Sequence, residues 1–494
     1  MMGLMPVDLI ILALCIPLFT AVGIYLAGNS PNVREGITLG GSLLLFLTIV
    51  ALTPHILDGE RPSFELIEIL PGLKLSFTVE PLGMIFALVA ATLWPINSLY
   101  SIGYMRSNNE RKQTRFYIFF AIALSSVMAI AFAGNLLTLF VFYEVLTLST
   151  YPLVTHAGTE KARNAGRVYL GILISTSIGL LLPAIIWVWY LAGTTDFTAG
   201  GILTGHISGP LLTVLAALFI FGIGKAAVMP THRWLPAAMV APTPVSALLH
   251  AVAVVKAGVF SVVKVVAYIF GLDLLITAPG IEWLLYIACF TVVAASIIAL
   301  QQDNLKKRLA YSTISQLSYV VMGALILAPL SLIGASLHIA VHAFGKITLF
   351  FAAGSIYTAS KKTNISQLNG IGRRMPWTMA AFSIGALSMI ALPPAAGFLS
   401  KWYLLLGASQ QQQYIAMAVI VMSTLLNAAY FVPIIYAAFL KPEDPDQLIE
   451  HKRDHKEAPL PMVIALTITA AATLLIFIFP GLALELAQAV GVPV

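Results

Sequence analysis

Long apolar runs, separated by short polar stretches, repeat along the whole sequence. A helix that crosses a bilayer needs about 20 predominantly apolar residues. Runs near this length occupy 6–27, 33–53, 79–104, 116–133, 135–156, 167–192, 209–231, 243–270, 280–301, 309–328, 331–357, 376–407, 413–439 and 460–487. The pattern predicts an all-α membrane protein with about fourteen transmembrane helices.

Composition supports this class. The 494 residues are 59% hydrophobic and only 10% charged, with a mean hydropathy of +0.93, whereas soluble domains average about 25% charged residues. No stretch between the runs is long enough for a soluble domain. We expect three regions: N-terminal helices one to three in 1–110, a core of helices four to thirteen in 111–440, and a cytoplasmic loop with the last helix in 441–494.

Basic residues are distributed asymmetrically between the loops. Twenty of the 27, including Arg34, fall in alternate loops counted from the first, and only Arg61 and Lys74 fall in the others. Lys and Arg accumulate in cytoplasmic loops. The distribution predicts a multi-pass protein of the cell inner (plasma) membrane with both termini outside the cytoplasm. The net charge of +6 therefore reflects topology and gives no indication of nucleic acid binding.

Six charged residues interrupt the apolar runs themselves. They are Glu144, Lys225, Lys256, Lys264, Lys346 and Lys401. A charge at the centre of a spanning helix costs roughly 2.5 to 3.5 kcal/mol on insertion scales, so such residues mark ion or proton pathways. Lys264 lies nearer a helix end, where a long side chain can reach the interface instead. Glu144 is the only carboxylate expected deep in the membrane.

Two of the runs contain prolines beside a lysine. Pro230 follows Lys225 in the seventh run, and Pro393 and Pro394 precede Lys401 in the twelfth. Proline removes a backbone donor, and a broken helix is tolerated in a membrane where it lines a polar cavity. We therefore expect both helices to break. Breaks in helices seven and twelve are typical of two inverted five-helix repeats, here helices 4 to 8 and 9 to 13.

Histidines extend the set of titratable residues. His338, His342 and Lys346 recur every four residues and therefore share one helix face. His250 precedes Lys256 by about 9 Å along the eighth helix. Histidine titrates near neutrality and passes protons, although His250 or His338 alone is equally consistent with a structural core histidine.

Lysine and glutamate together suit proton transfer. Burial lowers the pKa of a lysine and a nearby carboxylate raises it, so moving one partner switches the lysine between holding and releasing a proton. Glu144 and Lys225 are the candidate pair. The proton-transfer set is Glu144, Lys225, Lys256, Lys401, His250, His338, His342 and Lys346. With one deep carboxylate, the chain suits protons better than sodium ions.

No cofactor or metal is expected. Cys15 and Cys289 are isolated in separate runs, which excludes a thiol redox motif or an iron–sulfur ligand set. The Gly-Lys pair in FGIGKAAV lacks the spacing of a phosphate-binding loop. The sequence carries no catalytic redox site of its own.

Five segments resemble a known family. They are FYEVLTLSTYPLV around Glu144, GKAAVMPTHRWLP around Lys225, APTPVSALLHAVAVVKAG around Lys256, RLAYSTISQLSY at 308–319 and PPAAGFLSK ending at Lys401. Together they are similar to the antiporter-like subunits of respiratory complex I, membrane-bound hydrogenases and Mrp-type cation/proton antiporters. The resemblance covers roughly residues 75–440.

The resemblance implies roles for the buried residues. Glu144 and Lys225 would form the pair of a first half-channel, Lys256 and His342 a central relay, and Lys401 the terminal site of a second half-channel. It also implies fourteen helices with two inverted repeats, and partner membrane subunits in a larger complex. Ala237, Ala238 and Met239 replace an acidic residue and a His or Tyr that many members carry after WLP, which removes any role for that acid here.

Three functions follow as alternatives. His250 and the chain length favour the D-type subunit of an Mrp-type sodium/proton antiporter. A proton-pumping subunit of a complex I-like NADH:quinone oxidoreductase or a membrane-bound hydrogenase is the second. A non-transporting structural membrane subunit is the third. The driving reaction and the exchanged cation stay open.

Overall fold

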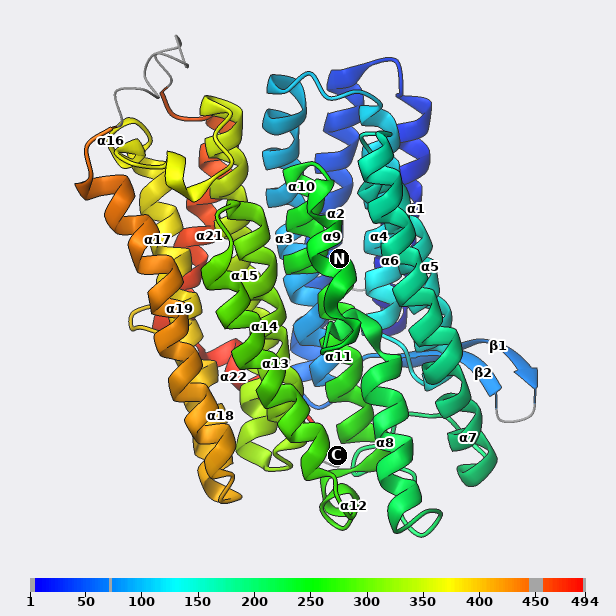
Figure 1. Cartoon of the computed structure of the whole chain (residues 1–494). Coiled ribbons are helices and arrows are strands. Elements are labelled where there is room, and N and C mark those ends of the chain that lie inside the picture. Colours follow the sequence, from blue (N-terminus) through cyan, green and yellow to red (C-terminus); the bar gives the residue numbers. More distant parts are fainter. Residues whose placement is uncertain (1–4, 71–72, 444–455, 492–494) are drawn as a thin grey trace.

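The computed structural model describes residues 5–70, 73–443 and 456–491. In this part of the chain, eleven helices are long and apolar enough to cross a membrane, and two shorter apolar helices, Pro210–Gly222 and Pro376–Ile390, belong to interrupted crossings. The predicted helical membrane fold is confirmed (Figure 1). The count of fourteen crossings stays a prediction.

The segment before α5 contains four helices and a β-hairpin, and the fourth helix already belongs to the expected core 111–440. Its elements are α1 (Pro6–Leu26), α2 (Pro31–Leu57), β1 (Ser63–Leu70), β2 (Leu73–Thr78), α3 (Pro81–Ser107) and α4 (Gln113–Ala131). The hairpin was not predicted. Its two antiparallel strands pair Ser63 with Thr78 and Leu70 with Leu73.

Side chains at the start of the next helix hold the hairpin in place. Asn135 donates from Nδ2 to the Lys74 carbonyl at 2.7 Å and to Ser76 Oγ at 2.9 Å, and its Oδ1 accepts from the Thr138 amide at 2.8 Å. Asn135 is thus both a helix N-cap and an anchor for β2.

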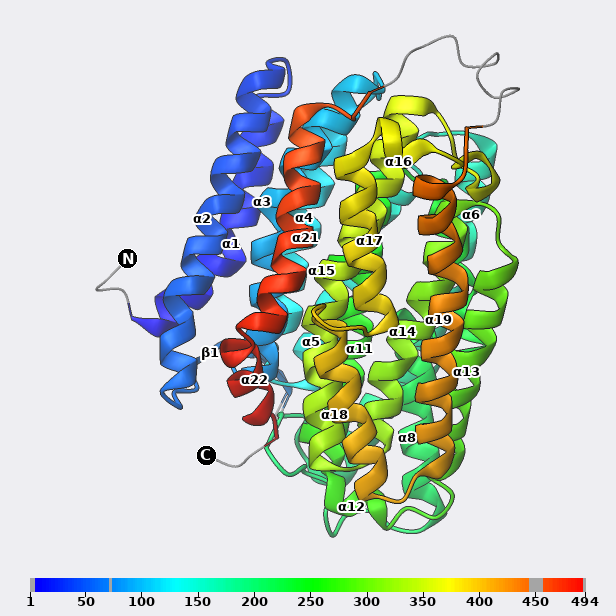
Figure 2. The same cartoon turned by 90° about the vertical axis from the view of Figure 1, so that its left-hand side faces the viewer.

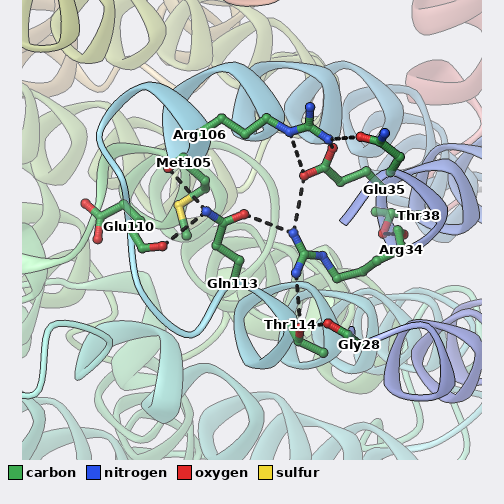
Figure 3. A network of polar contacts seen from close by, with 10 residues as sticks. Gly28, Arg34, Glu35, Thr38, Met105, Arg106, Glu110, Gln113 and Thr114 are labelled. Carbon is green, nitrogen blue, oxygen red and sulfur yellow. Dashed lines mark hydrogen bonds and ion pairs between the residues drawn. The ribbon is translucent and has the colours of Figure 1, made fainter. Parts of the chain in front are cut away.

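Arg34 was expected in a loop, but it lies in the first turns of α2, where it is 5% exposed. It donates to Thr114 Oγ1 at 3.1 Å and to Gln113 Oε1 at 2.9 Å, and it contacts Glu35, which also pairs with Arg106 (Figure 3). This cluster links α2, α3 and α4. Burial of the guanidinium is tolerated because both terminal nitrogens have partners, although Nε has none in the described chain.

The first half of the core contains the first broken helix. Its elements are α5 (Leu136–Val154), α6 (Glu160–Thr176), η1 (Ser177–Leu181), α7 (Leu182–Ala192), α8 (Pro210–Gly222), η2 (Gly224–Ala226), η3 (Thr231–Arg233), α9 (Trp234–Ala237), η4 (Ala238–Val240), α10 (Thr243–Ala247), η5 (Leu248–Val252), α11 (Val254–Val265), η6 (Val266–Phe270) and α12 (Leu272–Ile276). The break expected near Lys225 is present, because α8 ends at Gly222 and only short turns follow.

The second half repeats this interruption. Its elements are α13 (Glu282–Gln301), α14 (Leu305–Leu325), α15 (Pro329–Ser360), η7 (Ile365–Gln367), α16 (Ile371–Arg374), α17 (Pro376–Ile390), α18 (Gly397–Gln410), α19 (Tyr414–Leu440), α21 (Leu460–Ile478) and α22 (Gly481–Gln488). The chain between α17 and α18 contains Pro393 and Pro394, as expected.

Two crossings form the centre of the bundle. The apolar windows of α15 and of 243–270 are fully buried, whereas those of α1, α2, α19 and α21 are less than half buried. Helix α21 packs against α3, α15 and α17, which brings the end of the chain beside its beginning (Figure 2). The buried lysines and histidines on α11 and α15 therefore lie far from lipid.

The two ends of the bundle differ. The α1–α2 turn, α10 and α16 lie toward one end, here called the basic end, and α12 lies at the opposite end, while the β-hairpin projects from the side of the bundle (Figure 1). Lys452 and Arg453, expected in the last cytoplasmic loop, lie outside the described residues.

Candidate functional site

The second helix break frees a backbone carbonyl inside the bundle. In a continuous helix the Met389 carbonyl would accept from the amide four residues on, but that residue is Pro393, which has no N–H. The Met389 oxygen instead accepts from Lys401 Nζ at 3.0 Å and from Asn427 Nδ2 at 3.2 Å. The break thus creates an acceptor that holds a buried ammonium.

Lys401 is solvated by neutral groups. It is 4% exposed, and its Nζ lies 4.7 Å from the centroid of the Tyr319 ring. Its neighbour Gly397 starts α18 against α17, and a Cβ there would lie 1.8 Å from the Ser388 oxygen. Only glycine permits this close approach, which sets the position of the lysine.

The central relay residues lie in one line. Lys256 Nζ on α11 lies 2.8 Å from His342 Nδ1 on α15. The rings of His342 and His338 are 5.8 Å apart between centroids, and His338 Nδ1 lies 2.8 Å from Ser400 Oγ, next to Lys401. The structure therefore brings four predicted residues together, and adds Ser400.

Lys346 reaches the same place by a second branch. Its Nζ donates to Ser312 Oγ at 2.8 Å, and Ser312 Oγ lies 3.0 Å from the Tyr430 hydroxyl oxygen. Tyr430 bonds Asn427 Oδ1, and Asn427 bonds the Met389 carbonyl. Ser312, Asn427 and Tyr430 were not predicted. Polar residues three apart, at 427 and 430 within the apolar run 413–439, were a usable signal.

Lys225 is held by α5. Its Nζ donates to the Tyr143 carbonyl at 2.7 Å and to Thr147 Oγ1 at 2.6 Å, and lies 3.1 Å from the centroid of the Tyr143 ring. Glu144 is the next residue on α5. Neither of its carboxylate oxygens has a hydrogen-bond partner in the described part of the chain. The two residues are neighbours without a hydrogen bond between them.

Helix α11 packs directly on the turn that carries Lys225. A Cβ on Gly258 would lie 2.3 Å from the Lys225 carbonyl carbon and 2.3 Å from the Ala226 nitrogen. The glycine lets the helix of Lys256 approach the first broken helix at backbone contact. The two lysines are thereby joined by packing, and no hydrogen bond links them.

His250 lies apart from the bonded chain. It is in the π-helical turn η5, a distortion that is frequent at functional sites. Its ring centroid lies 4.8 Å from that of Phe350 on α15, and neither ring nitrogen has a hydrogen-bond partner within residues 5–70, 73–443 and 456–491.

Lys264 forms an ion pair inside the bundle. It is fully buried and its Nζ lies 2.8 Å from Glu80 Oε1, at the N-terminus of α3. Lys264 thus ends at a carboxylate beside a helix terminus, and its reach to the membrane surface stays a prediction. Glu80 is 6% exposed and Glu35 is 4% exposed, both near the N-termini of helices, whereas Glu144 is only partly buried.

The described residues contain no group of side chains that would bind a metal ion and no disulfide. No three or more His, Cys, Asp or Glu side chains there form a group that could hold a metal ion. Cys15 and Cys289 are both free. The titratable and polar groups at the centre are amines, imidazoles and hydroxyls, each of which can bind and release a proton.

Solved structures with the same fold belong to multisubunit membrane complexes. A chain of the Mrp complex from Dietzia sp. superimposes with a TM-score of 0.83 at 21% identity, covering 97% of both chains. A chain of the membrane-bound sulfane sulfur reductase, an archaeal respiratory membrane complex, gives a TM-score of 0.84 at 23% identity, covering 98% of this chain and 96% of that one. These likenesses establish the fold.

Sequence comparison identifies the family. NADH-quinone oxidoreductase subunit N of Desulforudis audaxviator is 31% identical over 442 residues, 88% of this chain and 87% of that protein. Chloroplastic NAD(P)H-quinone oxidoreductase subunit 5 of Adiantum capillus-veneris is 33% identical over 346 residues, 66% of this chain but only 46% of that protein. Residues 133–427 match the family described as NADH:quinone oxidoreductase/Mrp antiporter, TM. The chain belongs to this family of antiporter-like membrane subunits.

Proposed function

We propose that this chain translocates protons across the membrane as one subunit of a larger complex. The observation that carries the proposal is the line from Lys256 through His342 and His338 to Ser400 and Lys401. Each step joins groups that accept and release protons. A structural role alone gives no reason to bury several cations without carboxylate partners at such a cost.

The lysines are suited to hold a proton transiently. Lys256, Lys346 and Lys401 are bonded to neutral nitrogen or oxygen atoms in the described residues, and none of them pairs with a carboxylate there. Burial without a counter-charge disfavours the charged form of an amine, so such a group can give up its proton. A change in the charge of a nearby group then determines whether the lysine keeps its proton or releases it to the next group.

Lys225 and Glu144 are the proposed control point. Lys225 holds its proton against Tyr143 and Thr147, while the Glu144 carboxylate is unbonded beside it. Glu144 lies next to Val145 and one turn from Leu148, which are 37% and 58% exposed on the outer face of α5. A neighbouring subunit covering this face would change the field at Glu144, and through it the proton affinity of Lys225.

Transfer proceeds from Lys225 to the central line and then to Lys401. His250 and the α15 stripe of His338, His342 and Lys346 belong to this route. The two stripe imidazoles, whose ring centroids are 5.8 Å apart, exchange the proton through bound water, which polar buried sites commonly hold.

The first assignment within the family is the D-type subunit of an Mrp-type monovalent cation (sodium)/proton antiporter. The fold of the Dietzia Mrp complex chain and the presence of His250 support it. The partners would be the other membrane subunits, with protons and sodium as the transported ions, in the inner membrane with both termini outside. In this assignment a cation gradient is formed or used, and no redox centre is needed in the complex.

The second candidate is a proton-pumping subunit of a redox complex. It is favoured by the 31% identity to NADH-quinone oxidoreductase subunit N over most of both chains. The neighbouring genes discriminate between the two candidates. Genes for other Mrp subunits support the antiporter, and genes for quinone oxidoreductase or hydrogenase subunits support the redox complex.

A transport assay tests the proposal. The whole complex carrying Lys225→Ala or Glu144→Ala is reconstituted in vesicles, and proton transport is followed with a pH-sensitive dye. We expect assembly to persist and transport to be lost. Lys307→Ala, an exposed lysine on α14, is the matched control and should transport normally. Normal transport in both buried variants contradicts the proposal and favours a structural subunit.

A further inference from the structure

A cavity of about 270 Å³ opens at the basic end of the bundle, away from the bonded line of lysines and histidines. Its rim includes the exposed residues Ala157 and Thr363. Its floor is formed by buried residues: Tyr104 on α3, Thr243 at the start of α10, and Ala353 on α15. The cavity thus leads from the surface to the two crossings at the centre of the protein.

Two titratable groups of opposite charge line the cavity. Glu110 lies in the α3–α4 turn, and Lys306 lies in the first turn of α14 and donates from Nζ to the Ala241 carbonyl at 2.6 Å. Partial burial raises the pKa of Glu110, although Lys361 and Lys306 oppose this shift. The other titratable groups facing the cavity are Tyr104, Tyr357 and Lys362. Glu110 and Lys306 both lie where water reaches them.

Residues beneath the floor continue toward the buried lysines. His250 follows Thr243 by seven residues, and Ala353 follows Lys346 by seven, which in each case is two helical turns or about 10 Å. His250 packs against Phe350 of α15, so these two segments are in contact at that depth.

Unpartnered polar atoms lie in the same region. Asn97 on α3 is fully buried and donates to the Pro244 carbonyl of α10 at 3.5 Å, but its Oδ1 has no partner in the described chain. Both nitrogens of fully buried His250 are in the same situation. Buried polar groups are nearly always satisfied by protein or by ordered water. The unpartnered atoms of Asn97 and His250 lie between the cavity floor and a buried lysine, where they can hydrogen-bond a chain of bound water molecules.

We propose that Glu110 and Lys306 form a proton-uptake site that supplies the buried lysines through Asn97 and His250. In one cycle, hydronium in the cavity protonates the Glu110 carboxylate, forming one O–H bond and leaving water, and Glu110 passes that proton on to a neutral Lys306 amine, forming one N–H bond. Lys306 then gives the proton to the water chain above His250, and both groups regain their original state. The inference rests on the proposed function, and it adds the site at which protons enter the protein.

The test separates uptake from support of the fold. Arginine keeps the positive charge of Lys306 and its capacity to bond the Ala241 carbonyl, but it does not release a proton. The complex carrying Lys306→Arg or Glu110→Gln is reconstituted, and transport is measured at low buffer concentration and again with added imidazole. Imidazole is small enough to enter the cavity and deliver protons in place of the missing group.

We expect transport by both variants to fall on the order of a hundredfold at low buffer, the low end of the cost of losing a positioned proton-transfer group, and to recover with imidazole. Lys307→Arg, one residue away and exposed, should behave as wild type. Undiminished transport by Lys306→Arg overturns the inference. A loss of transport that imidazole does not restore also overturns it, because such a loss means that the replaced side chain stabilises the fold and does not take up protons. Lys256→Ala in the same assay tests the proposed function separately: if it transports normally, proton conduction itself is refuted.

Discussion

Lys401 Nζ donates a hydrogen bond to the Met389 carbonyl across 3.0 Å, and Pro393, four residues after Met389, has no amide to compete for this acceptor. Helix α17 ends at Ile390, where Ala391 adopts the left-handed conformation. The break is therefore the device that gives the buried ammonium its partner. Twelve residues separate the two, so the relationship is local in sequence although it forms inside the bundle.

Replacing Pro393 with alanine should weaken this site. The new amide competes for the Met389 carbonyl, so Lys401 and Asn427 lose part of their acceptor. We expect proton transport by the reconstituted complex to fall by roughly tenfold, equivalent to about 1.4 kcal/mol in the relevant barrier, while assembly on a native gel is retained. Pro461→Ala, in the first turn of α21, has no such carbonyl to release and should have little effect. Equal transport by Pro393→Ala and wild type would show that the freed carbonyl is unimportant.

The two branches that meet near Met389 can be cut separately. Ser400→Ala removes the partner of His338, and Asn427→Leu removes the link between Tyr430 and the Met389 carbonyl. If protons use both branches, each single variant keeps partial transport and the double variant loses nearly all of it. The rates of the four proteins in one dye assay decide this. A single variant as inactive as the double assigns transport to one branch alone.

The second broken helix was predictable because proline acts within a few residues, whereas the first, expected near Pro230, already ends at Gly222. The run 243–270 and the interruptions beside Lys225 and Lys401 were all predicted from apolar length and proline position. The β-hairpin was missed, because the segment 54–78 was treated as a charged loop although apolar and polar residues alternate in LKLSFT.

Pairings between distant helices could not be predicted in the same way. Glu80 and Lys264 are 184 positions apart, and Arg34 and Thr114 are 80 apart. Nothing local distinguishes Lys264, which is paired with a carboxylate, from Lys256, which contacts a histidine. The choice depends on which helices pack together, and this information is spread over the whole chain.

The Glu80–Lys264 pair should stabilise the fold without carrying transport. The two side chains are 9% and 0% exposed, and removal of one partner leaves a buried charge, which typically costs about 3 to 5 kcal/mol. We expect Lys264→Met to lower the thermal stability of the complex markedly. Adding Glu80→Gln, which keeps an oxygen for the amides of Leu82 and Gly83, should recover much of the loss. Thermal unfolding of the purified complex measures both. If the double variant is no more stable than Lys264→Met, the cost lies in packing and the buried charge is not its source.

Gly258 should be the residue through which α11 and the first broken helix depend on each other. A methyl group there would lie 2.3 Å from the backbone of Lys225 and of Ala226, so Gly258→Ala must push the η2 turn away from α11. Lys225 would then lose its short bonds to Tyr143 and Thr147, and transport should fall at least about tenfold, since small misplacements of reacting groups are costly. Gly171→Ala on α6 is the matched control, because a Cβ there meets no atom within 4 Å; it should leave transport unchanged. A Gly258→Ala complex that assembles and transports at the wild-type rate would mean that the position of Lys225 relative to α11 does not govern proton movement.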